Sequence, residues 1–370
     1  MKNIRVGVIG VGNIGTAHAS SIHANEIEGM ELGALCDIDE IRRRVLSDEF
    51  GVPIMASYEE LIDSGKVDAV IIATPHYFHP TISMYALKKG LHVLCEKPIG
   101  VYTQGLQELV RAGEESGKSF CVMLNQRANK LYTLARDIVK SGKIGKILRS
   151  VWIITNWYRT QEYYDSGSWR GSWQGEGGGV LMNQAPHNLD LWQWICDMPK
   201  RVYAVCNEGK YHNIEVEDEA TILAEYEDGS SGVFITSTGD KYGTNRLEIT
   251  GEKGKLLLEK GCLTFENDEG KEVVYDEEYN GHRIILQNFA NSILKGEELI
   301  SPASDAVNQL RLCNMAYLSS WKNEWVDIDF DENEYMSYLK RKIEQSRGIS
   351  RADGKNLFEK NYKKRWTTNW

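Results

Sequence analysis

The sequence predicts an α/β domain with a doubly wound parallel sheet, followed by an α+β domain with a large open, mostly antiparallel sheet. Three observations favour this fold class. A strand, a glycine-rich turn and a helix follow one another at 4–27. Strand and helix patterns then alternate to about residue 125, which is typical of a parallel sheet. From residue 146 onward, long segments alternate apolar and polar residues, which is typical of antiparallel strands with one buried face.

The glycine-rich turn predicts a dinucleotide-binding site. An apolar, β-branched run that starts at Ile4 ends at Gly10, and a helical pattern follows Gly15. In such turns the first glycine permits a tight bend, the second lets a pyrophosphate approach the backbone, and the third lets the helix pack closely on the strand. The N–H groups at the helix N-terminus then face the anion. The predicted contacts are Gly10, Gly12, Asn13, Ile14 and Gly15.

Asp37 supports this interpretation and favours NAD over NADP. The strand Met30–Cys36 leads into Asp37, 22 residues after Gly15, where a carboxylate can accept hydrogen bonds from the ribose hydroxyls. The same carboxylate would repel the 2′-phosphate of NADP. Three arginines at 42–44 lie a turn into the next helix, where a solvated helix face accounts for them. A plain glycine-rich turn with nothing bound is the alternative to the whole site.

The other elements of the first domain continue the alternation of helices and strands. The predicted helices are Thr16–Ile27, Glu40–Phe50, Tyr58–Ser64, Thr81–Lys89 and Gln104–Ser116. The predicted strands after Met30–Cys36 are Val67–Thr74, Leu91–Cys95 and Ser119–Leu124. The strand at 67–74 is almost continuously apolar, so it is expected to be buried on both faces.

Residues at the carboxyl ends of these strands are predicted to line the cofactor edge, because ligands bind there in doubly wound sheets. Pro98 favours an extended conformation of Lys97 and holds it at the end of a central strand. For His76 and His79, a structural or helix-capping role is the favoured interpretation. The predicted cofactor contacts at this edge are Ala73, Thr74, Pro75, His76, His79, Glu96, Lys97 and Asn125.

The second domain is predicted to be a broad sheet with one face covered by helices. Asp228-Gly229 and the segment 252–254 are typical of hairpin turns. The predicted strands are Lys146–Trp157, Arg201–Asn207, Glu219–Glu227, Ser231–Gly239, Arg246–Gly251, Lys255–Glu259 and Cys262–Asn267. The predicted helices are Leu131–Ser141, Met182–Cys196, segments near 282–295 and 303–320, and Glu334–Gln345.

These patterns divide the chain into a nucleotide-binding domain at 1–125, a substrate and oligomerisation domain at 126–330, and a C-terminal helix and tail at 331–370. The tail carries Phe358, Tyr362, Trp366 and Trp370 among lysines and arginines. Because disordered segments contain few aromatic residues, the tail is expected to pack on the second domain or on a neighbouring subunit. Simple fraying is the equal alternative.

A second motif combines three glycines with a polar helix face. Gly177–Gly179 precede the predicted helix, which carries Asn183, His187 and Asp190. The spacings of four and three residues place these side chains on one face. A glycine-rich approach to an imidazole indicates a substrate site, although a core histidine that bonds to a backbone carbonyl is the more frequent explanation of such a residue.

An aromatic cluster at 157–173 is predicted to contribute to a carbohydrate pocket. Sugars present apolar C–H faces ringed by hydroxyls, which suit aromatic platforms with hydrogen-bonding neighbours. A core or subunit-interface cluster is the equal alternative. The individual predictions for substrate binding are Arg127, which follows the last strand of the first domain, together with Tyr158 and Trp169.

Composition argues against several other classes of protein. The net charge is −10 and no strong basic block precedes the last twenty residues, which argues against nucleic-acid binding. The seven cysteines are scattered without a C-x-x-C pair, so they are expected to be reduced, as in the cytoplasm. No apolar run reaches the ~18 residues of a membrane span, and no metal-binding motif occurs.

Together these motifs resemble the glucose–fructose oxidoreductase/inositol dehydrogenase (Gfo/Idh/MocA) family over nearly the whole chain. The matching residues are Gly10–Gly15, Asp37, Ala73–Pro75, Glu96–Pro98, Gly142, Ile144-Gly145, Gly177–Gly179 and His187. The resemblance implies a Rossmann domain and a C-terminal domain on an open mixed sheet, which is often used for dimer or tetramer contacts. It also implies reversible oxidation of a secondary alcohol, usually on a sugar or cyclitol.

Residue by residue, the resemblance implies an acid–base pair. Lys97 is similar to the family's lysine that contacts the substrate hydroxyl and the cofactor region, and His187 is similar to its acid/base histidine. Asn183 stands where most members carry aspartate, and Ala185 where many carry glycine. Asn183 can still bond to a substrate hydroxyl, but it supplies no charge to raise the pKa of Lys97 or His187.

The resulting hypothesis is an NAD-dependent enzyme that interconverts a secondary hydroxyl and a ketone on a sugar, glycoside or cyclitol ring. His187 would accept the hydroxyl proton near neutrality, and Lys97 would stabilise alkoxide character. One alternative is glycoside cleavage by transient ring oxidation and elimination, with NAD regenerated in place. A second is a non-catalytic NAD-binding regulatory protein, which would be expected to lack the pair of Lys97 and His187.

Overall fold

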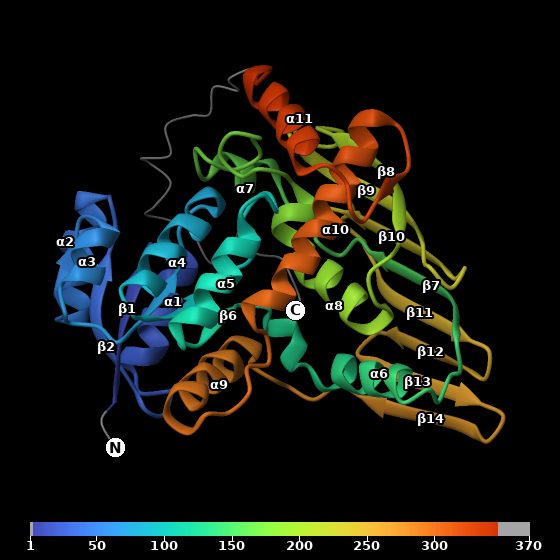
Figure 1. Ribbon diagram of the computed structural model, residues 1–370, viewed down its shortest axis with the longest axis horizontal. Coiled ribbons are helices and arrows are strands. Elements are labelled where there is room, and N and C mark those ends of the chain that lie inside the picture. Colours follow the sequence, from blue (N-terminus) through green and yellow to red (C-terminus); the bar gives the residue numbers. More distant parts are fainter. Residues whose placement is uncertain (1–2, 347–370) are drawn as a thin grey trace. The chain divides into compact units, whose positions relative to one another are not determined.

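The computed structural model describes residues 3–346, and the chain falls into two compact units. The first unit comprises Met1–Gly100, Gln104–Ala128 and Tyr279–Val307. The second comprises Val101–Thr103, Asn129–Glu278 and Asn308–Trp370. Each unit is built on a β-sheet of its own (Figure 1).

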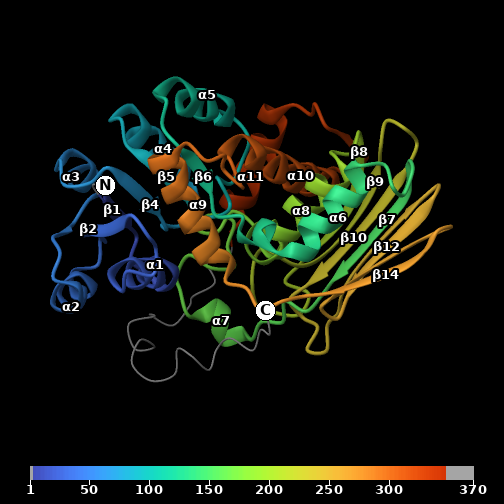
Figure 2. The same cartoon turned by 90° about the horizontal axis from the view of Figure 1, so that it is seen from below.

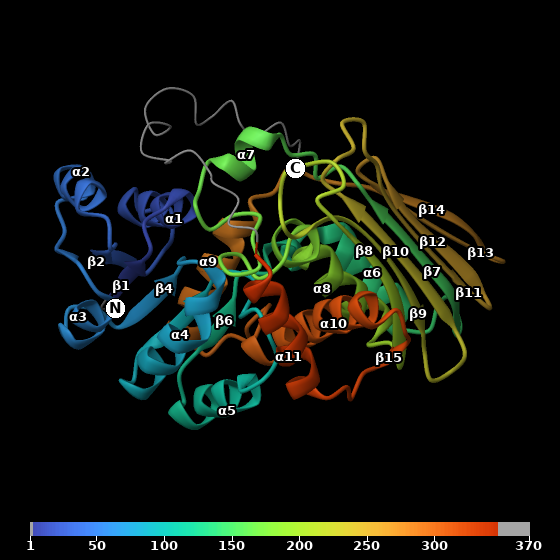
Figure 3. The ribbon, with the colours of Figure 1, turned by 90° about the horizontal axis from the view of Figure 1, so that it is seen from above.

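The first unit contains a six-stranded parallel sheet in the order β3-β2-β1-β4-β5-β6. Its strands are β1 (Ile4–Ile9), β2 (Met30–Cys36), β3 (Ile54–Met55), β4 (Ala69–Ile72), β5 (His92–Cys95) and β6 (Phe120–Val122). Helices α1 (Asn13–His23) and α2 (Glu40–Phe50) lie on one face, and α3 (Tyr58–Asp63), α4 (His79–Lys88) and α5 (Leu106–Ser116) lie on the other (Figures 2 and 3). The predicted doubly wound parallel sheet is therefore confirmed.

Strand order reverses between β1 and β4, which creates the crevice at which doubly wound sheets bind ligands. All four residues of β4 are buried, as expected for a strand covered on both faces. A continuous apolar run suits a strand covered on both faces, because a polar side chain on either face would lose its hydrogen bonds to water. The loops that follow β1, β4 and β5 therefore open at one edge of the sheet.

Helix α9 (Gly281–Lys295) packs with the first unit, although the strands of the second unit precede it in sequence. Ile285 and Phe289 lie in one apolar core with Ile22 of α1 and Val6 of β1. The backbone N–H of Val122 also donates to the carbonyl of Ser301 at 3.0 Å. The predicted domain boundary at residue 125 placed 279–307 in the second domain. These contacts correct that prediction, because apolar residues of α9 cover the α1 side of the parallel sheet.

The second unit contains a nine-stranded sheet in the order β14-β13-β12-β11-β7-β10-β9-β8-β15. Its strands are β7 (Ile147–Ile154), β8 (Arg201–Glu208), β9 (Glu217–Glu225), β10 (Ser231–Ser237), β11 (Asn245–Gly251), β12 (Gly254–Glu259), β13 (Cys262–Asn267), β14 (Gly270–Tyr275) and β15 (Val326–Asp327). Of the described pairs in this sheet, β7–β10 alone is parallel. The predicted open, mostly antiparallel sheet is confirmed.

Helices cover one face of this sheet, as the alternating pattern predicts. They are α6 (Lys130–Lys140), α8 (Pro186–Cys196) and α10 (Ala303–Lys322) (Figures 2 and 3). Beneath them, Phe234 of β10 packs its ring 6.0 Å from Trp152 and 5.4 Å from Trp192. Its neighbours Val233 and Ile235 point to the other face and are only half-buried. A period of two therefore separates the core face from the open face.

Several elements differ from their predictions for local reasons. The edge strand β14 was missed because nearly all of its residues are exposed, so it lacks an apolar stripe. The short helix α7 (Gln161–Asp165) was also missed. The helix expected over Met182–Cys196 is wrong at its start: a π-helix at Val180–Gln184 precedes α8, which begins at Pro186. Proline lacks an N–H and cannot continue the preceding hydrogen-bond ladder.

Helix α11 (Glu332–Glu344) belongs to the second unit and buries Tyr335 and Leu339. The hydroxyl of Tyr335 accepts a hydrogen bond at 3.0 Å from the amide of Asn314 on α10. The predicted packing of the tail rests on Phe358, Tyr362, Trp366 and Trp370, and these lie outside the described residues.

Candidate functional site

The glycine-rich turn between β1 and α1 has the shape that an anion requires. Gly10 has φ +85°, and a Cβ there would lie 2.7 Å from the Ala73 carbonyl oxygen. A Cβ at Gly15 would lie 2.0 Å from the Gly10 oxygen. At Gly12, by contrast, an added Cβ would meet only the Nη1 of Arg42 among the described atoms, at 3.7 Å. The first and third glycines thus allow close packing, and the second leaves space in front of the helix N-terminus.

Asp37 closes this turn from the end of β2. Its Oδ2 accepts from the Val11 N–H at 3.0 Å, and its Oδ1 accepts from the Asp39 N–H at 2.9 Å. Arg42 Nη1 lies 3.7 Å from the same Oδ2, and Arg43 Nη1 donates to the Asp37 carbonyl at 2.8 Å. The expectation that these arginines form a solvated helix face is wrong for Arg42 and Arg43, because both fold back onto the turn.

His79 connects the loops that follow β4 and β5. Its ring nitrogens lie 2.7 Å from the Thr74 carbonyl and 2.7 Å from the Pro98 carbonyl. Burial lowers the pKa of His79 below its ordinary value, and the two carbonyl contacts offset only part of this effect. His76 is buried beside it, with ring centroids 5.9 Å apart. These contacts support the structural interpretation of His79, which holds the Thr74 loop against the Lys97 loop.

Glu96 places a buried negative charge next to Lys97. Its Oε1 lies 2.8 Å from the Nε2 of His18 on α1, and its Oε2 accepts from the Lys97 N–H at 3.2 Å. Burial raises the pKa of Glu96, but the hydrogen bond and charge of His18, with weaker effects of His282 and Lys97, lower it to about 2. The Glu96 carboxylate is therefore ionised, and it lies directly before Lys97 at the end of β5. The peptide bond between Lys97 and Pro98 is cis.

Two histidines in this region carried no role in the sequence prediction. The rings of His18 and His282 lie 5.8 Å apart, and Nδ1 of His282 lies 3.2 Å from Nδ2 of Asn125. Burial lowers the pKa of His282. His18 follows Gly15 by one helical turn, which is a usable signal. His282 gave no such signal, because it reaches this edge only when α9 returns to the first unit.

Arg127 was predicted to contact substrate, and the structure places its buried side chain in an ion pair with the partly exposed Asp305. Its Nη1 donates to Asp305 Oδ2 at 2.7 Å and lies 3.4 Å from the Ile300 carbonyl. The Arg127 side chain is 1% exposed. The pair ties the short helix η2 (Asn125–Ala128) to the start of α10, so a structural role accounts for the position of Arg127.

In the second unit, Gly177–Gly179 pass directly over β9 and α10. A Cβ at Gly179 would lie 1.8 Å from the Glu217 carbonyl, and one at Gly178, where φ is +156°, would lie 2.2 Å from the Tyr317 hydroxyl. The Glu217 carboxylate accepts from the N–H groups of Gly179 and Leu181 at 2.9 Å each and from the Tyr317 hydroxyl at 2.8 Å. Burial raises the pKa of Glu217 to about 8, against these hydrogen bonds.

The polar residues of this motif lie on two helices rather than one. Asn183 belongs to the π-helix, whereas His187 and Asp190 lie in the first turns of α8. The single-helix spacing argument therefore holds for His187 and Asp190 and fails for Asn183, because the backbone changes its helical pitch between them. Single turns of π-helix are frequent at functional sites.

The aromatic cluster divides between core and accessible positions. Tyr163 and Tyr164 are buried with ring centroids 5.1 Å apart, and buried Trp173 packs 5.3 Å from Tyr317. These rings fit the core alternative. Tyr158 and Trp169 are half-buried, and the guanidinium of Arg170 lies 4.5 Å from the Trp169 ring. The two individually predicted aromatic residues thus retain accessible surface, as a ligand contact requires.

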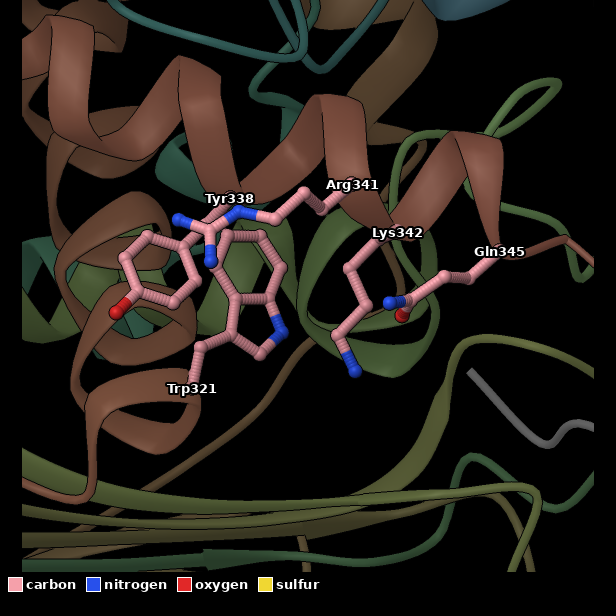
Figure 4. A pocket seen from close by; sticks show the side chains of 5 residues that line it. All are labelled: Trp321, Tyr338, Arg341, Lys342 and Gln345. Carbon is pink, nitrogen blue, oxygen red and sulfur yellow. The ribbon is translucent and has the colours of Figure 1, made fainter.

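A cavity of about 200 Å³ lies elsewhere in the second unit, between the end of α10 and α11 (Figure 4). The Arg341 guanidinium lies 4.3 Å from the Tyr338 ring, and Lys342 pairs with Glu208 at 2.8 Å. The lining residues are Trp321, Tyr338, Arg341, Lys342 and Gln345. None of the predicted site residues lines this cavity.

Within residues 3–346, no group of three or more His, Cys, Asp or Glu side chains is arranged to hold a metal ion. No helix in the same range has both the length and the hydropathy of a membrane span. All seven cysteines are free thiols, and burial raises the pKa of Cys36 to about 12. That the protein resides in a reducing compartment stays a prediction.

Comparison with known proteins gives matches along most of the chain. The family described as "Oxidoreductase family, NAD-binding Rossmann fold" matches residues 4–124, and the "GFO/IDH/MocA C-terminal domain" matches residues 132–257. The 1,5-anhydro-D-fructose reductase of Ensifer adhaerens is 24% identical over 252 residues, which cover 65% of this chain and 73% of that protein. The 2,7-anhydro-N-acetylneuraminate hydratase of Escherichia coli is 28% identical over 210 residues, which cover 55% of each.

Solved structures agree with these matches. The WlbA dehydrogenase from Bordetella pertussis, in complex with NADH and UDP-GlcNAcA, superimposes with a TM-score of 0.78 at 25% identity. The match covers 89% of this chain and 100% of that one. This chain therefore has the same overall fold as that dehydrogenase, including the NAD-binding domain.

Proposed function

The chain belongs to the Gfo/Idh/MocA family of NAD-binding oxidoreductases, and from this premise we propose that it interconverts a secondary hydroxyl and a ketone on a sugar, glycoside or cyclitol ring. The observation that carries the proposal is the edge of the first unit: a glycine turn after β1 shaped for a dinucleotide, with Lys97 just after the end of β5, two strands away in the same sheet. NAD supplies a hydride acceptor when it is bound. The protein must then supply a proton acceptor and a group that polarises the oxygen.

The residues of the first unit fit this cofactor. The space at Gly12 admits a pyrophosphate, and the N-terminus of α1 has no side-chain cap that would compete with an anion. The Asp37 carboxylate suits ribose hydroxyls. The Glu96 carboxylate, whose pKa is lowered to about 2, lies beside Lys97 at the strand end where we propose that the lysine ammonium would stabilise alkoxide character.

His187 is the proposed acid/base, and Asn183, Tyr158 and Trp169 are the proposed substrate contacts. An imidazole exchanges a proton near neutral pH, which suits reversible oxidation of an alcohol. Accessible aromatic and amide side chains suit the C–H faces and hydroxyls of a sugar ring. The names of the relatives support a carbohydrate, because both act on anhydro sugars.

A second candidate reaction is cleavage of a glycoside by transient ring oxidation and elimination, with the cofactor restored in each cycle. The hydratase relative favours it, because hydration involves no net oxidation. A non-catalytic regulatory protein is the third possibility, and the presence of Lys97 and His187 argues against it.

The test is a panel of pyranoses, methyl and aryl glycosides, anhydro sugars and inositols with NAD⁺ and the full chain. Absorbance would report reduced nicotinamide, and chromatography would report released aglycone or hydrated product. Accumulating NADH with one ligand class establishes the dehydrogenase. Product without net NADH establishes the second reaction. Cofactor binding with neither signal favours the regulatory protein.

Two variants assign the acid–base roles on whichever substrate reacts. Lys97→Met and His187→Gln are each expected to lower kcat by about 10²–10⁴-fold, the usual contribution of such groups. Lys130→Met is the matched control, because this exposed lysine pairs with Glu277 at 2.6 Å outside the site. If His187→Gln keeps most of its turnover and the wild-type pH profile, another residue is the base.

We also propose that the active form is a homo-oligomer that pairs the open face of the second unit's sheet. Among the described residues, no helix covers this face. It presents an aliphatic stripe formed by Val151, Ile153, Val233 and Ile235, with Val205 and Leu223 beside it. Such a stripe suits a second copy of the same surface.

A further inference from the structure

His18 is a polar residue on the buried face of α1. The residues that form this face are Gly15, His18, Ala19 and Ile22, and the His18 side chain is only 2% exposed. An apolar side chain would suit the position, because a buried polar ring without a partner loses the hydrogen bonds that water would provide. A histidine here therefore requires a polar partner, and the structure supplies Glu96.

Glu96 uses its two carboxylate oxygens towards two different elements. Oε1 lies 2.8 Å from Nε2 of His18, and Oε2 accepts from the backbone N–H of Lys97 at 3.2 Å. Because the pKa of Glu96 is lowered to about 2, the group is a carboxylate and accepts both hydrogen bonds. Nε2 of His18 is therefore the donor. One oxygen is held by α1, and the other holds the backbone of Lys97.

His18 also has the strongest influence in keeping Glu96 ionised. Burial raises the pKa of Glu96, and the hydrogen bond and charge of His18 come first among the effects that lower it. Glu217, which is buried with neutral donors, has a pKa of about 8. Without His18, the pKa of Glu96 is expected to rise from about 2 into the range between its ordinary value of 4.5 and that of Glu217. The other ionisable groups that interact with Glu96 are Lys97, His282 on α9, His79 on α4 and Cys95 on β5.

The position of His18 along α1 connects this contact to the cofactor site. The helix begins at Asn13 without a side-chain cap, so its first N–H groups suit a pyrophosphate, and His18 follows in the next turn. One rigid helix thus carries the anion-binding N–H groups and the donor that holds Glu96. A carboxylate beside an amine favours the ammonium form, which is the form that stabilises an alkoxide.

We propose that His18 is a positioning residue, which through Glu96 holds Lys97 in place and maintains a negative charge beside it. Lys97 enters as the proposed catalytic group, so this inference rests on the proposed function in that one respect. His18 itself touches neither the sugar nor the reacting atoms, and it acts only through the carboxylate.

The contact between His18 and Glu96 is tested without any substrate. In protein labelled with ¹³C at the glutamate side-chain carboxyls, the Glu96 signal is assigned by its loss in Glu96→Gln. Between pH 6 and pH 9 its chemical shift should stay constant in the wild type, because the pKa lies far below this range. In His18→Leu the signal should move towards the protonated position as the pH falls to 6. A signal that stays constant in both proteins overturns the inference.

Kinetics with the sugar identified by the panel separate positioning from a merely structural role. At pH 6 the kcat of His18→Leu should be at least about threefold below that of the wild type, and it should approach the wild-type value towards pH 9 as Glu96 releases its proton. His18→Gln should restore most of the loss at pH 6, because its carboxamide can donate to the same oxygen. A loss that is equal at every pH and is not relieved by glutamine would show a structural role and overturn the inference.

Two further variants test whether His18 acts through Glu96. Glu96→Gln should be impaired at every pH, and adding His18→Leu should change kcat by less than about twofold further, as expected for two residues of one path. A larger additional loss would contradict this path. His23→Leu is the matched control, because His23 lies exposed in the last turn of the same helix. If no sugar reacts, the proposed function fails, while the carboxyl titration still decides whether His18 controls Glu96.

Discussion

At the scale of single residues, two buried glutamates show how partners decide ionisation. Glu96 and Glu217 are both buried, and burial raises the pKa of a carboxyl. A histidine beside Glu96 lowers its pKa to about 2, whereas Glu217 has only neutral donors and its pKa rises to about 8. Glu96 therefore carries a negative charge next to Lys97. Glu217 anchors the glycine motif, and its contribution to the free energy of unfolding depends on pH.

Glu217→Gln should change how stability depends on pH. Because the folded pKa of Glu217 lies above its ordinary value, the folded state holds the proton more tightly than the unfolded state. Its contribution to the free energy of unfolding is full below about pH 4.5 and is lost as the pH rises towards about 8, by on the order of 4 kcal/mol. Thermal unfolding between pH 5 and pH 9 should show this loss in the wild type only. Parallel curves for the wild type and the variant would contradict the prediction.

Asp37→Asn should weaken the discrimination against NADP. The substitution removes the charge that repels a 2′-phosphate but keeps an acceptor for the Val11 N–H, and Arg42 Nη1 already lies 3.7 Å from Oδ2. Nicotinamide fluorescence should show NADPH binding about tenfold tighter than to the wild type. Adding Arg42→Gln should cancel this gain. An unchanged ratio of NADH to NADPH affinity would show that Asp37 does not set the preference.

At the scale of elements, the stretch from Gly177 to Cys196 depends on close backbone packing. The glycines bring the chain against β9, Glu217 binds the first N–H groups of the π-helix, and Pro186 starts a new helix with His187 in its first turn. The glycines and Pro186 are visible signals in the sequence, but the π-helix has no local signal. It depends on Glu217 of β9, which lies 36 residues from Leu181 along the chain. The position of Asn183 follows from that contact.

Gly179→Ala should strongly destabilise the second unit. A Cβ at Gly179 would lie 1.8 Å from a backbone oxygen of β9, which no side-chain rotation can relieve. The expected loss is about 3 kcal/mol or more, at the upper end of single substitutions. Gly167→Ala is the control, because its Cβ would meet its nearest neighbour at an ordinary 3.4 Å. Equal melting temperatures of the two variants would show that the strand can move aside.

At the scale of the whole molecule, the open face of the nine-stranded sheet is the surface with no evident purpose in a monomer. Its aliphatic stripe includes Val205 and Leu223, which are 47% and 42% exposed. Ion pairs border the stripe, with Arg246 and Lys255 both bound to Glu248 at 2.9 and 3.1 Å. An apolar centre with a polar rim is the usual composition of a subunit interface.

Leu223→Glu should convert the assembly to monomers, because it would bury an unpaired charge in the proposed interface. Light scattering after size-exclusion chromatography should give at least twice the chain mass of 42.0 kDa for the wild type and a single chain mass for the variant. Ile41→Lys is the control, since Ile41 is 76% exposed on α2. A monomeric wild type, or an unaffected variant, would exclude this surface as the interface.

The sequence by itself determined the features whose causes are local. The alternation of helices with apolar strands implied a parallel sheet, the period of two implied an antiparallel one, and the spacing of Gly10, Gly12 and Gly15 implied the dinucleotide turn. These patterns are readable because each residue's face or backbone freedom depends on its immediate neighbours. Site roles for Lys97 and His187 came from the family resemblance and stay predictions.

The tertiary structure decided what depends on residues far apart in the chain. It returned α9 to the first unit, where His282 lies beside His18, and it placed Arg127 in an ion pair with Asp305. It also brought Glu217 beneath the π-helix. No periodicity announces such contacts, because a charged side chain has the same sequence signature whether it faces a ligand or a buried partner.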